Sequence, residues 1–271
     1  MNKSILITND DGIYSPGLHA AIEAALPLGK VTVVAPEKQG TGMGRSIQGN
    51  WEDTLHETDL PLNGGSIRGY YCDCSPALSV AHGLQVLFPE KKPDLIISGI
   101  NYGENLGTVI TQSGTVGAAF QGAAAGIPAL AVSLQTELNQ YYEYDEIEWG
   151  GARYFLRLFA EKLLEKKMEP DVDMLKVDVP KEADKHTPWK ITRLSRQSYY
   201  HAKIPEPSLS SKISDIELTI EVDRDTLDPD SDVFALHVEN CVTVTPLSLD
   251  FTSRIDLQEF EQYLRRRHVD D

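Results

Sequence analysis

The first stretch of the chain that could do chemistry is Asn9-Asp10-Asp11-Gly12, which follows the apolar run from Ile5 to Ile7. Neighbouring side chains on a regular strand point to opposite faces, but the turn that Gly12 allows lets both carboxylates approach one point. Two close anions repel each other unless a cation or hydrogen-bond donors offset their charge. This stretch therefore predicts a divalent-metal site, with an ordinary Asx turn as the alternative.

Three further polar stretches could belong to the same site. A glycine-rich loop surrounds Thr41, which indicates either close backbone approach to a ligand or an ordinary flexible loop. Ser98 to Asn101 ends a buried apolar segment. Ser113-Gly114-Thr115 opens a run of small residues with helical character. A helix that begins there either offers its free N–H groups to an anion or is simply capped by the hydroxyl.

These polar stretches follow segments with the alternating pattern of an α/β protein. Buried strands are predicted at 5–7, 31–35, 94–100 and 129–133, and helices are predicted after Ser15-Pro16, after Ser75-Pro76 and over 116–125. A hairpin is predicted around Asn63-Gly64-Gly65. Ligands of open α/β sheets bind at the carboxyl ends of the strands, so the polar turns are expected to form one shared site.

Composition restricts the partners. The net charge is −16, with 41 acidic and 25 basic residues, which argues against nucleic acid or an anionic membrane as the main partner. Small phosphates need only a few local donors and remain possible ligands. The sequence has no long apolar run, and Cys72-x-Cys74 is interpreted as a packing pair. The seven histidines are scattered without ligand spacing. A cytoplasmic location is therefore expected.

The second half of the chain carries fewer signals. A tyrosine-rich acidic loop is predicted at 137–148 and a helix at 152–164. Strand-like runs follow at 218–222 and 241–244, and residues 254–268 have helical spacing. A chain of 271 residues with 41% hydrophobic content suits one large domain, or one domain with an extension.

Several motifs follow one another along the chain in a characteristic order. They are Thr8-Asn9-Asp10-Asp11-Gly12, Val34-Ala35-Pro36, Ser98-Gly99-Ile100-Asn101, Asn105-Leu106-Gly107, Ser113-Gly114-Thr115-Val116, the run from Gly126 to Ser133, and Val244-Thr245-Pro246-Leu247 with Asp250 and Thr252. By these motifs the chain is identified as a member of the SurE family (stationary-phase survival protein E), whose members are metal-dependent phosphatases that act mainly on nucleoside monophosphates. Similarity is dense over residues 4–135, sparse to about 230 and stronger again to 252, and residues 175–180 resemble the family's late strand.

The resemblance implies a fold and an assembly. It implies a Rossmann-like three-layer α/β core with a mostly parallel sheet over residues 1–180. Residues 181–271 would form a C-terminal β-hairpin and helix extension used in oligomerisation, so a homodimer or a dimer of dimers is expected. One departure is Leu78, at a position where the family commonly has an aspartate that could contact substrate or a second subunit.

The resemblance also implies a set of site residues. The implied metal ligands are Asp10, Asp11, Asn101 and Thr41, where Thr41 stands in place of the family's usual serine. The implied phosphate-binding residues are Asn9, Asn105, Ser113, Gly114 and Thr115. Carboxylate, hydroxyl and amide oxygens are hard donors, so one divalent ion is expected, Mg²⁺ or Mn²⁺, with Ca²⁺ as a substitute in a crystal.

The expected reaction is hydrolysis of a nucleoside monophosphate to nucleoside and phosphate, the activity of a 5'-nucleotidase. Asp10, Asn9, Asn105 and Ser113 are the expected catalytic residues, and Asp10 or Asp11 is the candidate base. The sequence leaves open whether water or Asp10 attacks phosphorus. The alternatives are an exopolyphosphatase, a phosphatase for another small phosphate ester, or a non-catalytic ligand-binding or scaffold member of the family.

Overall fold

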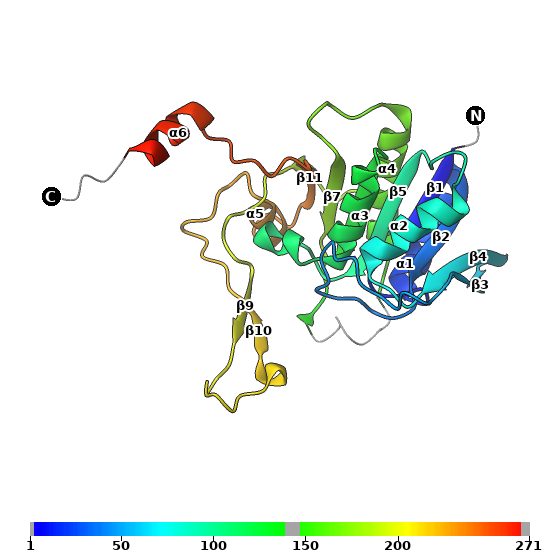
Figure 1. Ribbon diagram of the computed structural model, residues 1–271, viewed down its shortest axis with the longest axis horizontal. Helices are drawn as coiled ribbons and strands as arrows, with labels where there is room; N and C mark the ends of the chain where they lie inside the picture. Colours follow the sequence, from blue (N-terminus) through cyan, green and yellow to red (C-terminus); the bar gives the residue numbers. More distant parts are fainter. Residues whose placement is uncertain (1–2, 139–146, 267–271) are drawn as a thin grey trace.

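A nine-stranded sheet runs through the part of the chain that the computed structural model describes, residues 3–138 and 147–266 (Figure 1). The strand order is β3-β4-β2-β1-β5-β6-β7-β11-β8. The strands are β1 (Ser4–Thr8), β2 (Lys30–Pro36), β3 (His56–Leu62), β4 (Gly65–Cys72), β5 (Leu95–Tyr102), β6 (Ala129–Leu134), β7 (Met174–Val179), β8 (Trp189–Ile191) and β11 (Val242–Leu247). The strands from β4 to β7 in this order are parallel, whereas β3 is antiparallel to β4 and β11 is antiparallel to β7.

Helices cover both faces of the sheet, because successive residues of each buried strand point to opposite sides. On β1, Ile5 and Ile7 belong to the core that includes α1 (Pro16–Ala25) and α4 (Gly150–Glu165). Leu6 belongs to the opposite core, with α2 (Pro76–Leu87) and α3 (Gly114–Ala124). The three-layer, mostly parallel α/β fold is therefore confirmed. The described chain also has short 3₁₀ turns at η1 (Leu26–Leu28), η2 (Gly107–Thr111) and η4 (Ile213–Asp215).

Serine caps fix where the helices of the core begin. The hydroxyls of Ser15, Ser75 and Ser113 accept the backbone N–H three residues later, at 3.2, 3.4 and 3.1 Å. Proline stands directly after Ser15 and Ser75, where its missing N–H costs nothing. The helices after Ser15 and Ser75 therefore begin where the sequence predicts, and α3 begins at Gly114, slightly before the predicted range of 116–125.

The chain beyond residue 180 divides between the main sheet and an extension (Figure 1). β8 and β11 complete one edge of the main sheet, so the sheet continues past the predicted core boundary. β9 (Tyr200–Lys203) and β10 (Glu217–Ile220) form a separate antiparallel pair, and α5 (Asp232–His237) follows. α6 (Leu257–Arg265) has no buried residue and lies apart from the sheet. Of the predicted loop at 137–148, residues 139–146 lie outside the described residues.

Two expectations from composition have a structural outcome. Cys72 is buried at the end of β4, as expected for a packing residue, but it is also joined to Cys74 in a disulfide. The pair is therefore more than packing, because the chain brings the two Cα atoms to 5.5 Å, within the usual range for a disulfide. None of the helices in the described residues is long and apolar enough to cross a membrane.

Candidate active site

The predicted site lies where the order of the strands in the sheet reverses. From β1 the chain moves outward to β2 and β4, and then returns to β5 on the other side of β1. Thr8 at the end of β1 pairs with Ser98 of β5, so the residues that follow each of them emerge at one edge. Ligand sites of open α/β sheets form at this position. Asn9 to Asp11 and Asn101 therefore meet where the fold favours a ligand.

Asp10 and Asp11 are both buried beside this edge, with 4% and 3% of their surface exposed. Gly12 has a φ of 99°, which provides the turn that the sequence predicts. The backbone N–H of Tyr102 donates to Asp11 Oδ2 at 3.3 Å, and the Gln39 amide donates to Asp11 Oδ1 at 3.2 Å. The two carboxylates thus leave β1 as an adjacent, buried pair.

Thr115 connects this pair to Asn101. Its hydroxyl donates to Asp10 Oδ1 and lies 3.0 Å from Asn101 Oδ1. The Asn101 amide nitrogen donates to the carbonyl oxygens of Tyr102 and Gly103, at 3.1 and 2.6 Å. These two bonds occupy the nitrogen and turn the amide oxygen toward Thr115. Oxygen atoms from three separate segments therefore converge on one point.

Burial disfavours the ionised form of both carboxylates in the free protein. It raises the pKa of Asp10 to about 6, although hydrogen bonds from the Thr115 hydroxyl and from the backbone of Gly114 and Thr115 partly offset this effect. Burial and, secondly, the charge of Asp10 raise the pKa of Asp11 well above its usual range. A divalent cation beside both groups would offset both causes, so the pair fits the metal that the sequence predicts.

The donors around this point are hard oxygen atoms. Within the described residues, no three side chains of His, Cys, Asp or Glu lie together as a metal-binding group. The site therefore combines two carboxylates with the neutral oxygens of Asn101 and Thr115. Such a set suits Mg²⁺ or Mn²⁺ and leaves coordination positions for water or a phosphate oxygen.

The start of α3 packs directly against Asp10. A side chain on Gly114 would place its Cβ 2.7 Å from Asp10 Oδ2, so glycine is required at this position. The Ser113 hydroxyl caps the helix through the N–H of Val116 at 3.1 Å, and its own hydrogen remains available to a ligand. The two interpretations of this stretch, a capped helix and an anion site, are thus compatible.

Asn9 and Asn105 have different surroundings. The Asn9 amide nitrogen donates to Gly12 O at 3.0 Å, while its oxygen is buried and has no hydrogen-bond partner among the described residues. The Asn105 amide nitrogen donates to Ser133 Oγ at 2.8 Å. Its backbone N–H donates to Asp178 Oδ1 at 2.7 Å. Asn9 thus stays within the turn of the carboxylate pair, whereas Asn105 is anchored by neighbouring strands β6 and β7.

The glycine-rich loop reaches the site through its backbone. Gly40 N–H donates to Asp10 O at 2.6 Å, but the side chain of Thr41 is exposed and has no hydrogen bond to the described residues of the site. Gly44 has a φ of 56° and presses against α3, where a Cβ on Gly117 would lie 2.1 Å from Gly44 O. These glycines permit close approach between two parts of the protein backbone, and a ligand role for Thr41 remains a prediction.

Two features near the site were not predicted from the sequence. One is Gln39, whose amide donates to Asp11 and which carries no pattern that singles it out. The other is a buried charged cluster of Lys176, Asp178 and Asp232, to which Asn105 is bonded. A signal for the cluster was present, since Lys176 and Asp178 alternate within an otherwise apolar strand.

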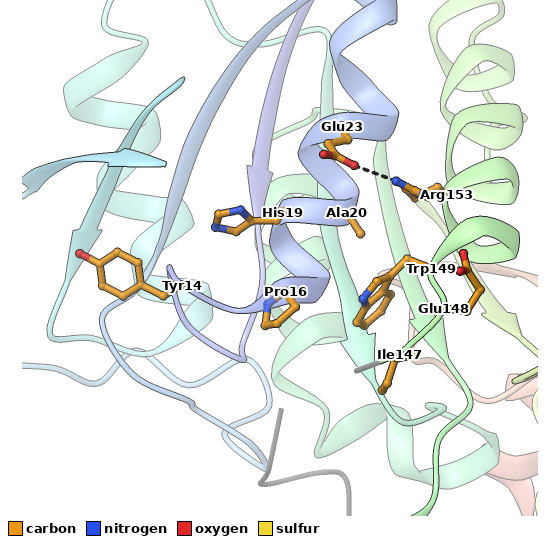
Figure 2. A pocket seen from close by; sticks show the side chains of 9 residues that line it. All are labelled: Tyr14, Pro16, His19, Ala20, Glu23, Ile147, Glu148, Trp149 and Arg153. Atoms are coloured by element: carbon orange, nitrogen blue, oxygen red, sulfur yellow. Dashed lines mark hydrogen bonds and ion pairs between the residues drawn. The ribbon is translucent and has the colours of Figure 1, made fainter. Parts of the chain in front are cut away.

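A pocket of about 450 Å³ opens between the start of α1 and the start of α4 (Figure 2). Tyr14 and His19 line one side, and Trp149 lines the other. The ion pair between Glu23 and Arg153, at 2.7 Å, lies within its lining. Trp149 packs edge to face against Tyr102, with ring centroids 5.0 Å apart. The buried ring of Tyr102 thus packs behind Trp149 and holds this wall of the pocket in place.

Comparison with known proteins gives consistent matches over nearly the whole chain. The profile of the family described as Survival protein SurE matches residues 5–201. A protein of Thermococcus gammatolerans named 5'-nucleotidase SurE is 37% identical over 96% of this chain and 95% of its own length. A protein of Methanosarcina acetivorans with the same name is 35% identical, over 97% and 98%. The crystal structure of the SurE protein from Aquifex aeolicus superposes with a TM-score of 0.74 at 30% identity, covering 97% of this chain and all of that one.

Proposed function

The chain belongs to the SurE family, and from this we propose that it is a metal-dependent phosphomonoesterase, a 5'-nucleotidase that hydrolyses nucleoside monophosphates to nucleoside and phosphate. The relatives that carry this name match 96–97% of the chain, which supports the same activity here. The observation that carries the proposal is the convergence of Asp10, Asp11, Asn101 and Thr115 at the reversal point of the sheet.

The proposed metal ligands are Asp10, Asp11, Asn101 and Thr41. Their chemistry suits one divalent ion, Mg²⁺ or Mn²⁺. When bound, such an ion polarises a phosphoryl oxygen and lowers the pKa of a coordinated water. The burial of both aspartates, which raises their pKa values, supports a cation at this position, because a cation would stabilise the ionised carboxylates away from water.

The proposed phosphate-binding residues are Asn9, Asn105, Ser113, Gly114 and Thr115, and each would supply hydrogen-bond donors to the phosphoryl group. Ser113 has a hydroxyl hydrogen to donate, and the Asn105 amide has a second hydrogen beyond the one given to Ser133. Asn9 and the backbone of Gly114 and Thr115 complete the set. These groups would hold the phosphoryl oxygens as charge redistributes in the transition state. Asp10 is the proposed catalytic carboxylate, and Asp10 or Asp11 would take up a proton from an attacking water.

Residues 181–271 are proposed to serve oligomerisation, giving a homodimer or a dimer of dimers. α6 supports this role because it exposes Phe260, Tyr263 and Leu264 and buries no residue of its own. A Phe260→Glu and Leu264→Glu variant should have a smaller molar mass by light scattering than the wild type. Gln262→Glu on the same helix is the matched control and should leave the mass unchanged. Equal masses for all three proteins would contradict this part of the proposal.

We propose neither nucleic acid nor a membrane as a partner. The net charge of −16 argues against a nucleic-acid surface, and the described helices include no membrane span. A cytoplasmic location accords with these properties and is part of the proposal.

A phosphate-release screen tests the proposed activity. The wild type and Asp10→Asn are assayed on nucleoside monophosphates, sugar phosphates and polyphosphate, each with Mg²⁺, Mn²⁺ or a chelator. Metal-dependent release from nucleoside monophosphates by the wild type alone would support the proposal. Preference for polyphosphate or sugar phosphates would favour the other phosphatase activities. Absence of release from every substrate would favour a ligand-binding or scaffold role.

A further inference from the structure

Behind Asn105 lies a cluster of three charged side chains, Lys176, Asp178 and Asp232, which we call the ionic cluster. All three are fully buried. Lys176 Nζ donates to Asp178 Oδ2 and, at 3.1 Å, to Asp232 Oδ2. Lys176 and Asp178 are two residues apart on β7 and so share a face, whereas Asp232 is the first residue of α5. The ionic cluster therefore joins the core sheet to the segment beyond residue 180.

The ionic cluster also holds the turn that follows β5. The backbone N–H of Asn105 donates to Asp178 Oδ1 at 2.7 Å. The backbone N–H of Gly107 donates to Asp232 Oδ2 at 2.9 Å. Two carboxylates bonded to one lysine thus bind the backbone on both sides of the buried Leu106. This arrangement fixes the position of Asn105 relative to β7 and α5.

Stability alone does not account for such a cluster. Removing charges from water is costly, and well-packed apolar residues in place of a buried ion pair are often neutral or stabilising. What apolar residues cannot do is accept the N–H groups of Asn105 and Gly107. Asp232 additionally accepts the N–H groups of Ser195 and Val233 through Oδ1, both at 2.9 Å. The ionic cluster thus organises several backbone segments around the turn that carries Asn105.

We propose that Lys176, Asp178 and Asp232 are positioning residues that hold Asn105 in place to bind the phosphoryl group. This inference rests on the phosphate-binding role proposed above for Asn105. The Asn105 side chain gives one amide hydrogen to Ser133 at 2.8 Å, and its backbone nitrogen is held by Asp178. Because both the backbone and the side-chain amide of Asn105 are held, the second hydrogen of that amide points in a fixed direction. Loss of the backbone anchor lets the turn shift, and a displacement of about 1 Å costs about 10²-fold in rate.

The first experiment measures AMP hydrolysis, and its inhibition by inorganic phosphate, in Asp178→Ala and Asp232→Ala. We expect kcat to fall about 10²-fold in each and inhibition by phosphate to weaken. Thr192→Val is the matched control. It removes a buried hydrogen bond of 2.9 Å to Thr245 of β11, the strand that pairs with β7. Neither threonine is hydrogen-bonded to the described residues of the turn that carries Asn105. This control should remain within about twofold of the wild type.

A double-mutant cycle separates positioning from a general structural role. If Asp178 acts through Asn105, then Asp178→Ala should cost less than about threefold when Asn105→Ala is already present. A full, multiplicative loss in that background would overturn the inference, because the damage would then be independent of Asn105. Should Asp178→Ala fail to fold, the same cycle is run with Asp232→Ala, which removes the acceptor of the Gly107 N–H on the other side of the turn.

The Asn105→Ala variant also distinguishes the two levels of the proposal. Impaired Asn105→Ala together with wild-type kinetics in both aspartate variants would overturn the positioning role and leave the proposed phosphate site intact. Wild-type kinetics and phosphate inhibition in Asn105→Ala would instead overturn the phosphate-binding role itself, and the positioning role with it.

Discussion

Replacing Glu104 by glutamine should remove a pH-dependent weakness of the fold. Glu104 precedes Asn105, has only 2% of its surface exposed, and accepts the Tyr199 hydroxyl at 2.6 Å. Burial raises its pKa from 4.5 to about 7, although the Tyr199 hydrogen bond lowers it somewhat. Glutamine keeps the shape and the acceptor oxygen but has no charge to bury.

The magnitude follows from the difference between the two pKa values. Each tenfold change in the ionisation equilibrium corresponds to about 1.4 kcal/mol, so the rise from 4.5 to about 7 makes the ionised form about 3 kcal/mol less favourable in the folded protein. The side chain is almost completely buried, so solvent screening reduces this figure little.

The sign of the pH dependence follows from linkage. Below pH 4.5 Glu104 is neutral in both the folded and the unfolded chain, so its ionisation costs nothing. Between 4.5 and about 7 the unfolded chain loses the proton while the folded chain retains it, and the free energy of unfolding therefore falls as pH rises. Above about 7 both states are ionised, and the full cost of about 3 kcal/mol is present.

Urea unfolding of the metal-free protein measures this effect. The free energies of unfolding of wild type and Glu104→Gln should be similar near about pH 5, and the variant should be about 3 kcal/mol more stable near about pH 8. Tyr199→Phe is the companion variant, because losing the hydroxyl should raise the Glu104 pKa further and enlarge the drop. A difference between wild type and Glu104→Gln that is constant across this pH range would refute the reasoning.

The remaining predictions concern the proposed metal and phosphate site. Asp10→Asn or Asp11→Asn should abolish turnover while raising the stability of the metal-free protein, because each removes a buried anion; normal turnover with Mg²⁺ present would contradict the metal assignment. Thr41→Ser should stay active and Thr41→Ala should bind metal more weakly by calorimetry, and equal affinities for wild type and Thr41→Ala would exclude Thr41 as a ligand. Ser113→Ala should slow all phosphate esters by a similar factor of about 10²–10³, and steady-state kinetics that show loss of only one substrate would be inconsistent with contact to the phosphoryl group.

The core of the fold could be predicted because its signals are local. β1 and β5 are short apolar runs that end in polar turns. The starts of α1 and α2 are marked by a capping serine, Ser15 or Ser75, that is followed directly by proline. The carboxylate pair at Asp10 and Asp11 could be predicted for the same reason, since adjacency and Gly12 are visible within four residues. Once the strands were inferred to be parallel, the polar turns could be placed together at the carboxyl ends of the strands, where open α/β sheets bind their ligands.

The contacts that were missed join residues far apart in sequence. Thr115 bonds to Asp10 across 105 positions, and Lys176 bonds to Asp232 across 56. No periodicity within one segment reports such pairings, because they depend on the order of strands in the sheet. For the same reason β8 and β11 were not placed in the main sheet. The run at 241–244 was recognised as strand-like, but its pairing with β7 depends on the order of the strands, and β8 has only three residues and so carries little pattern.

The electrostatics of the site link the cation to the substrate. A phosphate ester brings negative charge to a position already lined by Asp10 and Asp11, in a protein whose net charge is −16. The backbone N–H groups at the start of α3 cannot offset this charge alone, because those of Gly114 and Thr115 already act on Asp10 and lower its pKa. A divalent cation held by the two carboxylates would neutralise their charge, so that the N–H groups of Gly114 and Thr115 could interact with the phosphoryl oxygens. We therefore expect the cation to bind before the phosphate ester or together with it, and α3 to contribute to phosphate binding only in the metal-loaded protein.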